Sequence, residues 1–450
     1  MRFRHRHTAA SLIAAIALGA FYLTRWQGLL IPVRIAGGSM AESLVGDHFR
    51  RICDDCRFPC RYDAALLPRA RQVMCPNCGA LNIHPPDGVI ERGDRVGIDR
   101  WVYRWRRPAR WEVVAFRSPG QDHSLGVKRI VGLPGEVLEF RQGQVYANGR
   151  MIRKSLAQLR DVAQRVHDQR YTSEAADPVR ARWQPEPGAR WQPVYSGFQL
   201  RPAEGKSVGS SGDFQWLAYH HRLGGWAERG ATAPIWDSYA YNQGLSRQLY
   251  QVTDVLLVGN LIPEEPGGQV AWEVQGAGKR YRVVVDIGQR RATLFRNRQR
   301  VHGSDLPVAA LRSGTQFELA WCDGQLLFSL GGRQVFRFCD PSVEEAGAVE
   351  AEWEETRAVF RMGARGGAWV VDRLQVYRDL YYLEPRSTDQ PWKTPYQLAD
   401  NSFFVVGDNI PISRDSRHLG VLPKEKLLGP VRKKPNFLVL RRLTGRRTSE

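Results

Sequence analysis

The 450-residue sequence predicts a mainly β protein, in which an antiparallel core is interrupted by two insertions and preceded by an apolar helix. Two observations predict this fold. Short runs of valine, isoleucine and aromatic residues recur along the chain and are separated by glycine-containing turns, which is the pattern of antiparallel sheets. A hydrophobic content of 43% and an aromatic content of 10% are typical of a folded chain, and 450 residues are enough for two or three domains.

Residues 1–27 are predicted to be a cytoplasmic N-terminus followed by a single transmembrane anchor. Residues 8–24 form an uncharged run of 17 residues, which is within the range that can span a bilayer as a helix. Three arginines lie among the first six residues and favour a cytoplasmic N-terminus. The alternative is a cleaved secretory signal, because Ala17 and Gly19 are small enough for a cleavage site.

The net charge of +19 indicates attraction to an anionic surface. No nucleic-acid-binding motif accompanies this charge, and the arginines are spread along the whole chain. We therefore expect membrane lipid, and no nucleic acid, as a partner. A basic surface that is only solvated is the alternative.

Residues 28–48, the first part of the predicted core, contain a candidate nucleophile. Ser39 follows Gly37 and Gly38 and precedes Met40. Glycines without a Cβ let the backbone turn tightly and approach a ligand closely. An ordinary turn serine is the alternative for a Gly-Ser pair in isolation.

Residues 49–87 contain two Cys-x-x-Cys pairs separated by 18 residues. The four cysteines are Cys53, Cys56, Cys75 and Cys78. This spacing matches a four-cysteine zinc ribbon, because each pair holds one edge of a tetrahedral ion. Four thiolates leave no position for a reactive water, so the expected zinc is structural. Cys60 and His84 are weaker candidate ligands, and two disulfides are the alternative to a metal.

Residues 88–150 are predicted to be a second, hairpin-rich part of the core. Strands are expected at 93–99, 111–116 and 127–131, and Asn148-Gly149 predicts a tight turn. Lys128 opens the third of these runs. In isolation, such a lysine is most simply interpreted as a surface residue on a strand.

Residues 151–182 are predicted to contain an amphipathic helix, because apolar residues recur every three or four positions between 151 and 170. Residues 183–385 are predicted to be a linker, at 183–212, followed by an inserted β-sandwich with turns such as Asp323-Gly324. We expect Cys322 and Cys339 to be buried free thiols, since a meander would place them roughly 9–10 Å apart, beyond the reach of a disulfide.

The sandwich segment resembles a concanavalin-type or laminin-G-like jelly roll in its strand pattern. Such folds often bind sugars, but a fold alone does not establish a function.

Residues 386–450 are predicted to return to the core and to end in a basic tail.

Four segments occur in a characteristic order: 35–45, 93–96, 127–136 and 405–420. Together they resemble the conserved boxes of type I signal peptidases, membrane-bound serine proteases that use a Ser-Lys dyad. The first box departs from the family pattern at Glu42, where a proline is usual. Gly37 also stands where some relatives place a serine that assists the oxyanion hole.

The resemblance implies roles for several residues. Ser39 is the expected nucleophile and Lys128 the general base. Ser413 is expected to hydrogen-bond the lysine, and Asp415 and Arg417 to form a pair that braces the site. Two further residues are expected nearby: Arg129 as an ion-pair partner and Met40 as an apolar neighbour of the lysine.

A lysine can act as a base only when it is neutral. At an ordinary pKa of about 10.4, roughly one lysine in two thousand is neutral at pH 7. Burial must therefore lower the pKa, and a shift of about 3 units corresponds to about 4 kcal/mol. Apolar neighbours such as Val127, Ile130 and Val131 are available to provide this environment.

The resemblance therefore implies a serine endopeptidase of the bacterial inner membrane, with its catalytic domain on the exported side and secretory pre-proteins as substrates. Catalysis is expected to need no cofactor. The alternative is a catalytically decayed, membrane-anchored binding protein whose sandwich binds a glycan or a protein.

Overall fold

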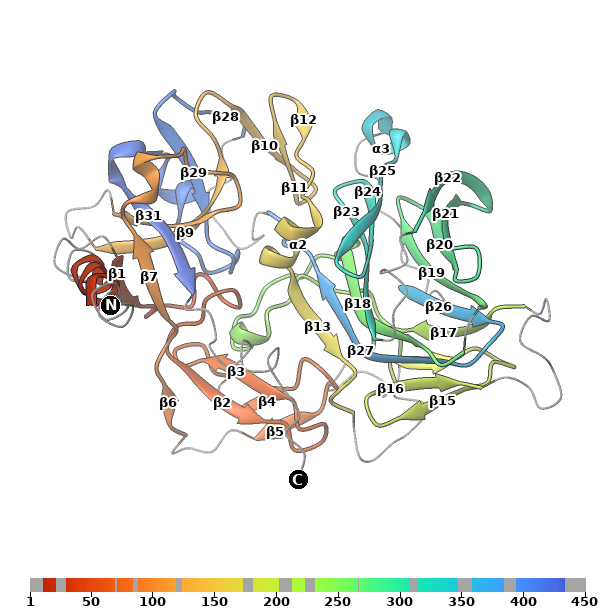
Figure 1. The fold of residues 1–450 in the computed structure, drawn as a ribbon. Helices are drawn as coiled ribbons and strands as arrows, with labels where there is room; N and C mark the ends of the chain where they lie inside the picture. Colours follow the sequence, from red (N-terminus) through yellow and green to blue (C-terminus); the bar gives the residue numbers. More distant parts are fainter. Residues whose placement is uncertain are drawn as a thin grey trace, which may run out of the picture. The chain divides into compact units, whose positions relative to one another are not determined.

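The chain folds into two units, each assembled from segments that are separate in the sequence. The first unit comprises Met1–Asp47, Arg92–Val137 and Tyr396–Glu450, and the second comprises His48–Glu91 and Leu138–Pro395. The computed structural model describes residues 11–21, 30–68, 71–83, 88–118, 124–172, 181–201, 213–222, 231–265, 267–306, 314–346, 358–383 and 394–433. The fold is mainly β, as predicted (Figure 1).

One seven-stranded antiparallel sheet organises the first unit. In spatial order, its strands are β1 (Leu30–Arg34), β7 (Arg95–Asp99), β31 (Leu427–Lys433), β8 (Val113–Arg117), β9 (Leu125–Gly132), β29 (Ser402–Val406) and β30 (Leu422–Pro423). Three short helices, η1 (Val102–Arg104), α4 (Ser416–Leu419) and η5 (Lys424–Lys426), and the two-residue strand β28 (Tyr396–Gln397) complete this unit. The sheet places chain segments around residues 30, 128 and 405 in one layer.

Two apolar clusters support this sheet. One is formed by β8, β9, β29 and β30 and includes Val114, Ile130 and Val405. The other includes Ile35, Met40, Leu44 and Val96 and lies under the segment that follows β1. In β7 the buried residues Val96 and Ile98 alternate with less buried ones, as in a strand with one buried face, whereas all five residues of β29 are buried.

Residues 11–21 form a helix at the start of the described chain, and its large apolar side chains, such as Leu12 and Ile16, are exposed. No helix in the part of the chain that the structure describes is long and apolar enough to cross a membrane. Residues 8–10 and 22–24 of the predicted anchor lie outside the described residues.

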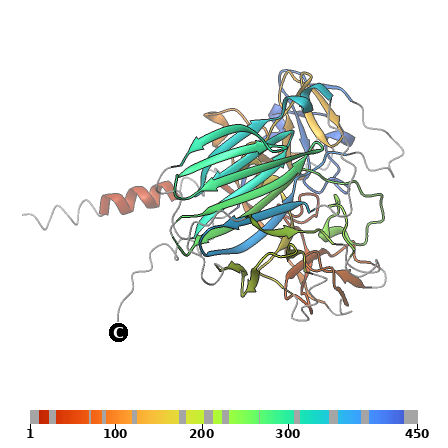
Figure 2. The same cartoon turned by 90° about the vertical axis from the view of Figure 1, so that its right-hand side faces the viewer.

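The second unit contains a large antiparallel sandwich with one shared core (Figure 2). Its first sheet contains β13 (Gln164–Asp168), β15 (Trp191–Val194), β16 (Gly197–Leu200), β18 (Val255–Pro263), β23 (Thr315–Cys322), β24 (Gln325–Leu330), β25 (Arg333–Cys339) and β27 (Trp369–Arg378). Its second sheet contains β14 (Trp183–Pro185), β17 (Gln215–Tyr219), β19 (Gln269–Gly276), β20 (Lys279–Asp286), β21 (Arg291–Arg296), β22 (Gln299–Asp305) and β26 (Phe360–Arg365). Trp183, Trp272 and Trp369 are among the side chains buried between the sheets.

Smaller elements accompany the sandwich. The segment 48–91, which we call the ribbon, contains β2 (His48–Ile52), β3 (Pro59–Asp63), β4 (Gln72–Met74), β5 (Leu81–Ile83) and β6 (Ile90–Glu91). The remaining elements are β10 (Val137–Arg141), β11 (Gln144–Ala147), β12 (Arg150–Met151), α2 (Leu156–Val162), η3 (Ala240–Asn242) and α3 (Pro341–Ala346). The predicted Asn148-Gly149 turn joins β11 to β12, with positive φ angles of 51° and 74° at the two residues.

Two predictions for the start of the sandwich were wrong. The helix predicted between 151 and 170 is limited to α2, because residues 164–168 pair with β27 as strand β13. Val162 and Val166 are four residues apart, a spacing that fits either period, and pairing with β27 decided between them. The predicted linker at 183–212 contains β14, β15 and β16, whose prolines lie in strands with no further neighbour on one side.

Cys322 and Cys339 lie at the ends of β23 and β25, on either side of Gln325 in β24. Both are free thiols, as predicted. Cys322 is buried, but the expectation of burial was wrong for Cys339, which is exposed at the edge of its sheet.

Candidate active site

Ser39 lies in the loop that follows β1, and this loop is held by the segment that follows β29. The backbone N–H of Asn409 donates to the carbonyl oxygen of Ser39 at 3.1 Å. The Asn409 side-chain amide donates to the carbonyl oxygen of Gly38 at 2.9 Å. Asn409 is fully buried, so these bonds are shielded from water and position the serine.

Lys128 projects from β9 toward the same loop. Its strand pairs with β8 on one side, where Lys128 is opposite Val114, and with β29 on the other. The Lys128 ammonium nitrogen, Nζ, lies 2.6 Å from Ser39 Oγ. The structure therefore brings the predicted nucleophile and the predicted base into direct hydrogen-bonding contact, although 89 residues separate them.

The Lys128 side chain is buried, whereas Ser39 is only partly buried. Burial lowers the pKa of Lys128 below its ordinary value. The Asp415 carboxylate opposes this shift, and the Arg417 guanidinium adds to it. Burial outweighs the nearby carboxylates, since none of them, within the described residues, forms an ion pair with Lys128.

Two buried ion pairs lie beside the Ser-Lys contact. Arg129 Nε donates to Asp408 Oδ1 at 2.7 Å, and the same guanidinium also donates to the Trp111 carbonyl at 2.6 Å. Arg417 Nε donates to Asp415 Oδ1 at 2.7 Å. Each arginine is therefore matched to its own carboxylate, and among the residues that the structure describes no carboxylate forms an ion pair with the neighbouring lysine.

Asp415 also organises the backbone after β29. It caps the N-terminus of α4 through the Arg417 N–H, and it accepts a 2.9 Å hydrogen bond from the Gly407 N–H. Although burial alone would raise the pKa of the Asp415 carboxyl, the Arg417 charge lowers it. Because the Asp415 carboxylate stays ionised, it keeps these hydrogen bonds and holds the turn between β29 and α4 in place.

Ser413 does not make the hydrogen bond to Lys128 that the family resemblance implies. Its hydroxyl is buried and has no hydrogen-bond partner among the described residues, although it lies close enough to Asp415 to help lower the pKa of that carboxyl. A Cβ at Gly407 would collide with the Ser413 hydroxyl and with the Ser39 carbonyl. Glycine at 407 is therefore required by close packing against the nucleophile loop.

The other predicted supporting residues have different surroundings. Met40 is buried in the apolar cluster beneath the loop, next to Ser39. Gly37 is exposed, and an added Cβ would meet no atom of the described chain within 4 Å. The predicted need for glycine at 37 is therefore not explained by packing within the described residues. Glu42, at the position where the family has proline, is exposed.

Sequence reasoning assigned no role to Gly407, Asp408 or Asn409. A signal was present, because the Gly-Asp-Asn sequence directly follows a buried strand, where small and polar residues end strands and mark turns. Their particular partners are in segments 279 and 371 residues away, and no local pattern identifies such contacts.

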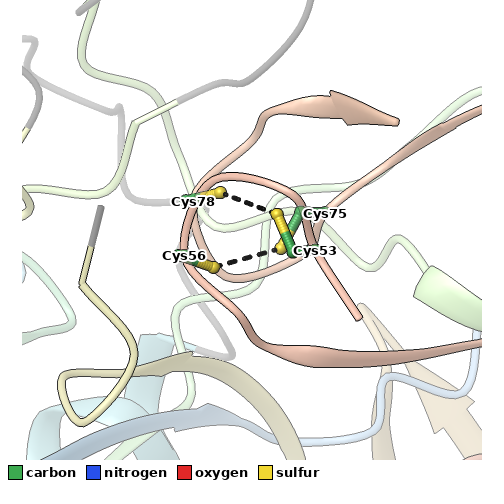
Figure 3. A group of neighbouring side chains, drawn as sticks. All are labelled: Cys53, Cys56, Cys75 and Cys78. Carbon is green, nitrogen blue, oxygen red and sulfur yellow. Dashed lines mark hydrogen bonds between the residues drawn. The ribbon is translucent and has the colours of Figure 1, made fainter. Parts of the chain in front are cut away.

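Two side-chain clusters in the second unit have metal-binding residue types. One consists of Cys53, Cys56, Cys75 and Cys78, whose sulfur atoms point toward one another (Figure 3). The other consists of Asp254, Cys322, Asp323 and Asp379. In this second cluster the Lys154 ammonium lies 2.7 Å from Asp323 and 2.9 Å from Asp379, so a lysine already supplies the positive charge.

Comparison with known proteins links segments of both units to one family. The family model "Signal peptidase, peptidase S26" matches residues 82–191 and 373–434. "Signal peptidase I V" of Bacillus subtilis is 30% identical over 80 residues, which cover 18% of this chain and 46% of that protein. "Probable signal peptidase I-2" of a Synechocystis strain is 38% identical over 69 residues, which cover 14% of this chain and 32% of that protein. The chain thus spans less than half the length of these relatives.

Solved structures also align to parts of the chain. A carbohydrate-binding module, CBM66, of Bacillus subtilis has a TM-score of 0.23 and 11% identity, covering 44% of this chain and 94% of that one. A Bacillus subtilis protein described as having a galectin-like fold has a TM-score of 0.28 and 11% identity, covering 49% of this chain and 99% of that one. At these TM-scores neither similarity bears on the function of the sandwich, which is defined by its own strands and core.

Proposed function

We propose that this protein is a serine endopeptidase that removes signal peptides from exported pre-proteins, with Ser39 as the nucleophile and Lys128 as the general base. The observation that carries the proposal is the 2.6 Å contact between Ser39 Oγ and a buried Lys128 Nζ with a lowered pKa. A serine hydroxyl is a weak nucleophile, and a neutral amine within hydrogen-bonding distance can activate it. The partial match to the signal-peptidase family, which includes Lys128 but begins after Ser39, supports signal-peptide removal as the activity.

The proposed reaction has two halves. Neutral Lys128 accepts the Ser39 proton as Oγ attacks the substrate carbonyl carbon, and the resulting ammonium then returns a proton to the leaving amine. In the second half, Lys128 accepts a proton from water as the water oxygen attacks the acyl-enzyme ester, and the resulting ammonium returns that proton to the departing Ser39 oxygen, which regenerates the hydroxyl and the neutral amine. The backbone N–H of Ser39 would donate to the oxyanion, because it has no acceptor within the described part of the chain.

The expected setting of this activity follows the family resemblance. We infer a single membrane anchor at the N-terminus, lipid as a neighbour of the site, and a catalytic unit on the exported side of the membrane. Fractionation of cells that produce the full chain, followed by alkaline extraction, tests this arrangement. Recovery of the active protein with the membrane is the expected result.

A precursor-cleavage assay with the full chain tests the catalytic proposal. Ser39→Ala should abolish cleavage of a secretory precursor, and a serine-reactive lipopeptide probe should label the parent protein but not this variant. Ser43→Ala is the matched control, because Ser43 lies in the same loop and takes no part in the proposed chemistry. Cleavage that persists in Ser39→Ala, with circular dichroism unchanged, would contradict the proposal.

A second candidate function is binding by the sandwich. A hollow of about 760 Å³ lies over strands β19–β21, and six Lys or Arg residues and three Asp or Glu residues line it. The excess of cationic residues, which include Arg280, Arg291 and Arg298, favours an acidic glycan or an acidic protein segment. A parent protein that fails to react with the serine probe, but binds acidic polysaccharide, would favour this function over the peptidase.

A further inference from the structure

The four ribbon cysteines are spaced for a single metal ion. Cys53 Sγ lies 3.6 Å from Cys78 Sγ, and Cys56 Sγ lies 3.7 Å from Cys75 Sγ (Figure 3). A tetrahedral zinc ion with Zn–S bonds of about 2.3 Å separates its sulfur ligands by about 3.8 Å. A disulfide would instead hold two sulfurs at about 2.05 Å. The thiols are therefore gathered around a common centre and are not bonded in pairs.

The backbone repeats the same turn around both cysteine pairs. The Arg57 N–H donates to the Cys53 carbonyl, and the Gly79 N–H donates to the Cys75 carbonyl. Both residues after the pairs have positive φ angles, 61° at Arg57 and 81° at Gly79. Two equivalent turns that present their thiols to one point are the arrangement expected of a zinc ribbon, in which each turn supplies two ligands.

Two buried asparagines donate to the cysteine sulfurs. Asn77 Nδ2 lies 3.8 Å from Cys56 Sγ, and Asn82 Nδ2 lies 3.7 Å from Cys53 Sγ. N–H groups directed at thiolates compensate the negative charge of a four-thiolate site and orient its ligands. These contacts are a second feature, independent of the sulfur spacing, that fits a metal-bound thiolate cluster.

A fifth thiol lies next to the cluster and is the natural internal control. Cys60 Sγ is 3.8 Å from Cys75 Sγ, but it donates to the Phe58 carbonyl at 3.6 Å. A thiol that donates a hydrogen bond keeps its proton, whereas a zinc ligand must lose it. Because four thiolates complete a tetrahedral site, Cys60 is the thiol that does not act as a metal ligand.

Asn77 also joins the cysteine cluster to the sandwich. Its side-chain N–H donates to the Tyr171 carbonyl at 2.8 Å, and its side-chain oxygen accepts the Asp168 N–H at 2.7 Å. Phe58 of the ribbon contacts Tyr171 edge to face, with ring centroids 5.2 Å apart. Among the described residues, the Asn82 side chain makes no comparable contact, since its other hydrogen bonds are to Asp54 and Ala80 within the ribbon.

We propose that Cys53, Cys56, Cys75 and Cys78 bind one structural zinc ion, and that the metal holds Asn77 in place to dock the ribbon on β13. The metal orders the turn between Cys75 and Cys78, and Asn77 lies within that turn. Loss of the ion would release the turn and, with it, the hydrogen bonds to Asp168 and Tyr171. The four-thiolate site has no open position, so the ion takes no part in peptide hydrolysis.

Metal analysis of the purified full chain tests the binding site. One zinc per chain is expected for the parent and for Cys60→Ser, and strongly reduced zinc for Cys53→Ser or Cys78→Ser. Cobalt exchanged into the parent should give the visible absorption of a tetrahedral tetrathiolate centre, a readout that does not depend on the folding of any variant. A parent without bound metal, or with two ribbon disulfides by intact mass, would overturn the site.

The two asparagines separate docking from metal binding. In Asn77→Ala, hydrogen exchange of the peptide 164–171 should be about tenfold faster because two hydrogen bonds are lost, while zinc is retained. Asn82→Ala loses the equivalent N–H to sulfur contact, but exchange at 164–171 should be unchanged. Zinc removal from the parent by a chelator should reproduce the Asn77→Ala pattern. Unchanged exchange after zinc removal would refute the coupling.

Discussion

Two buried lysines, one in each unit, have opposite electrostatic surroundings. Lys128 of the first unit contacts the Ser39 hydroxyl, and burial lowers its pKa. Burial also disfavours the charge of Lys154 in the second unit, but the carboxylates of Asp323 and Asp379 outweigh that effect and raise its pKa well above the ordinary value. The comparison teaches that burial lowers the pKa of a lysine, and so favours a base, only where no carboxylate forms an ion pair with it.

The difference arises from how each unit distributes its acids. Near Lys128, each carboxylate is matched to an arginine, Asp408 to Arg129 and Asp415 to Arg417. Around Lys154, Asp323 and Asp379 share one lysine, and Asp254 lies next to these two carboxylates. The first arrangement favours the neutral form of the lysine, which proton transfer requires, and the second suits a rigid internal ion pair.

The largest expected difference between the two lysines is in catalysis. Lys128→Met should reduce precursor cleavage by at least about 10³-fold, because the general base is lost. Lys154→Met should leave kcat of the folded protein within about twofold of the parent, since its ammonium is committed to structural carboxylates. Single-turnover cleavage at a temperature where both variants are folded measures both effects. If the two variants lost kcat to a similar extent, the distinction between a catalytic Lys128 and a structural Lys154 would be wrong.

The second expected difference is in stability, and it runs in the opposite direction. Lys154→Met should lower the free energy of unfolding of the second unit by about 3–5 kcal/mol, because it leaves buried carboxylates without a counter-charge. Lys128→Met should not lower stability in this way, since it removes a buried amine that forms no ion pair within the described part of the chain. Urea denaturation followed by tryptophan fluorescence provides the comparison. If Lys128→Met had a lower free energy of unfolding than Lys154→Met, the contrast between an unpaired and an ion-paired lysine would be wrong.

The pH dependence of cleavage should report the lowered pKa of Lys128. Activity requires the neutral amine, so kcat/KM should rise about tenfold per pH unit below that pKa and level off above it, at a pH below 10.5. The profile should contain this single basic ionisation in the parent and in Lys424→Ala, a control at an exposed lysine. A profile that continues to rise through pH 10.5 would place the base outside the buried site.

The smallest expected effect concerns the acids around Lys154. Burial, with the charges of Asp323 and Asp379, raises the pKa of Asp254 from 3.8 to about 7. The folded protein therefore holds a proton that the unfolded chain releases, and this stabilisation is complete below pH 3.8 and lost as pH rises through about 7.

Asp254→Asn should remove this part of the pH dependence. Its amide can still accept from Gln144 and face the Tyr381 hydroxyl, so the fold is retained. Between pH 4 and 7, the stability of the variant should fall less steeply than that of the parent, by up to about 1.4 kcal/mol per pH unit. Denaturation series at several pH values measure the slopes, and parallel slopes would contradict the shifted pKa.

The parts of the fold that depend on local sequence were predictable. Asn148-Gly149 and Asp323-Gly324 turn between strands with positive φ angles, as their residue types indicate. The helix at 151–170 and the linker at 183–212 were predicted wrongly for a related reason. Their residues are ambiguous in isolation, and pairing with β27 or β17 determined that 164–168 and 183–185 are strands.

The sequence by itself determined the strand-rich fold, the tight turns and the two Cys-x-x-Cys pairs, because each depends on residue type and short spacing. Its resemblance to a family singled out Ser39 and Lys128 as candidates. Only the tertiary structure decided that Lys128 lies beside Ser39 while Lys154 lies between aspartates. The surroundings of a buried charge come from strands that are distant in the sequence, and a pKa depends on those neighbours more than on the residue itself.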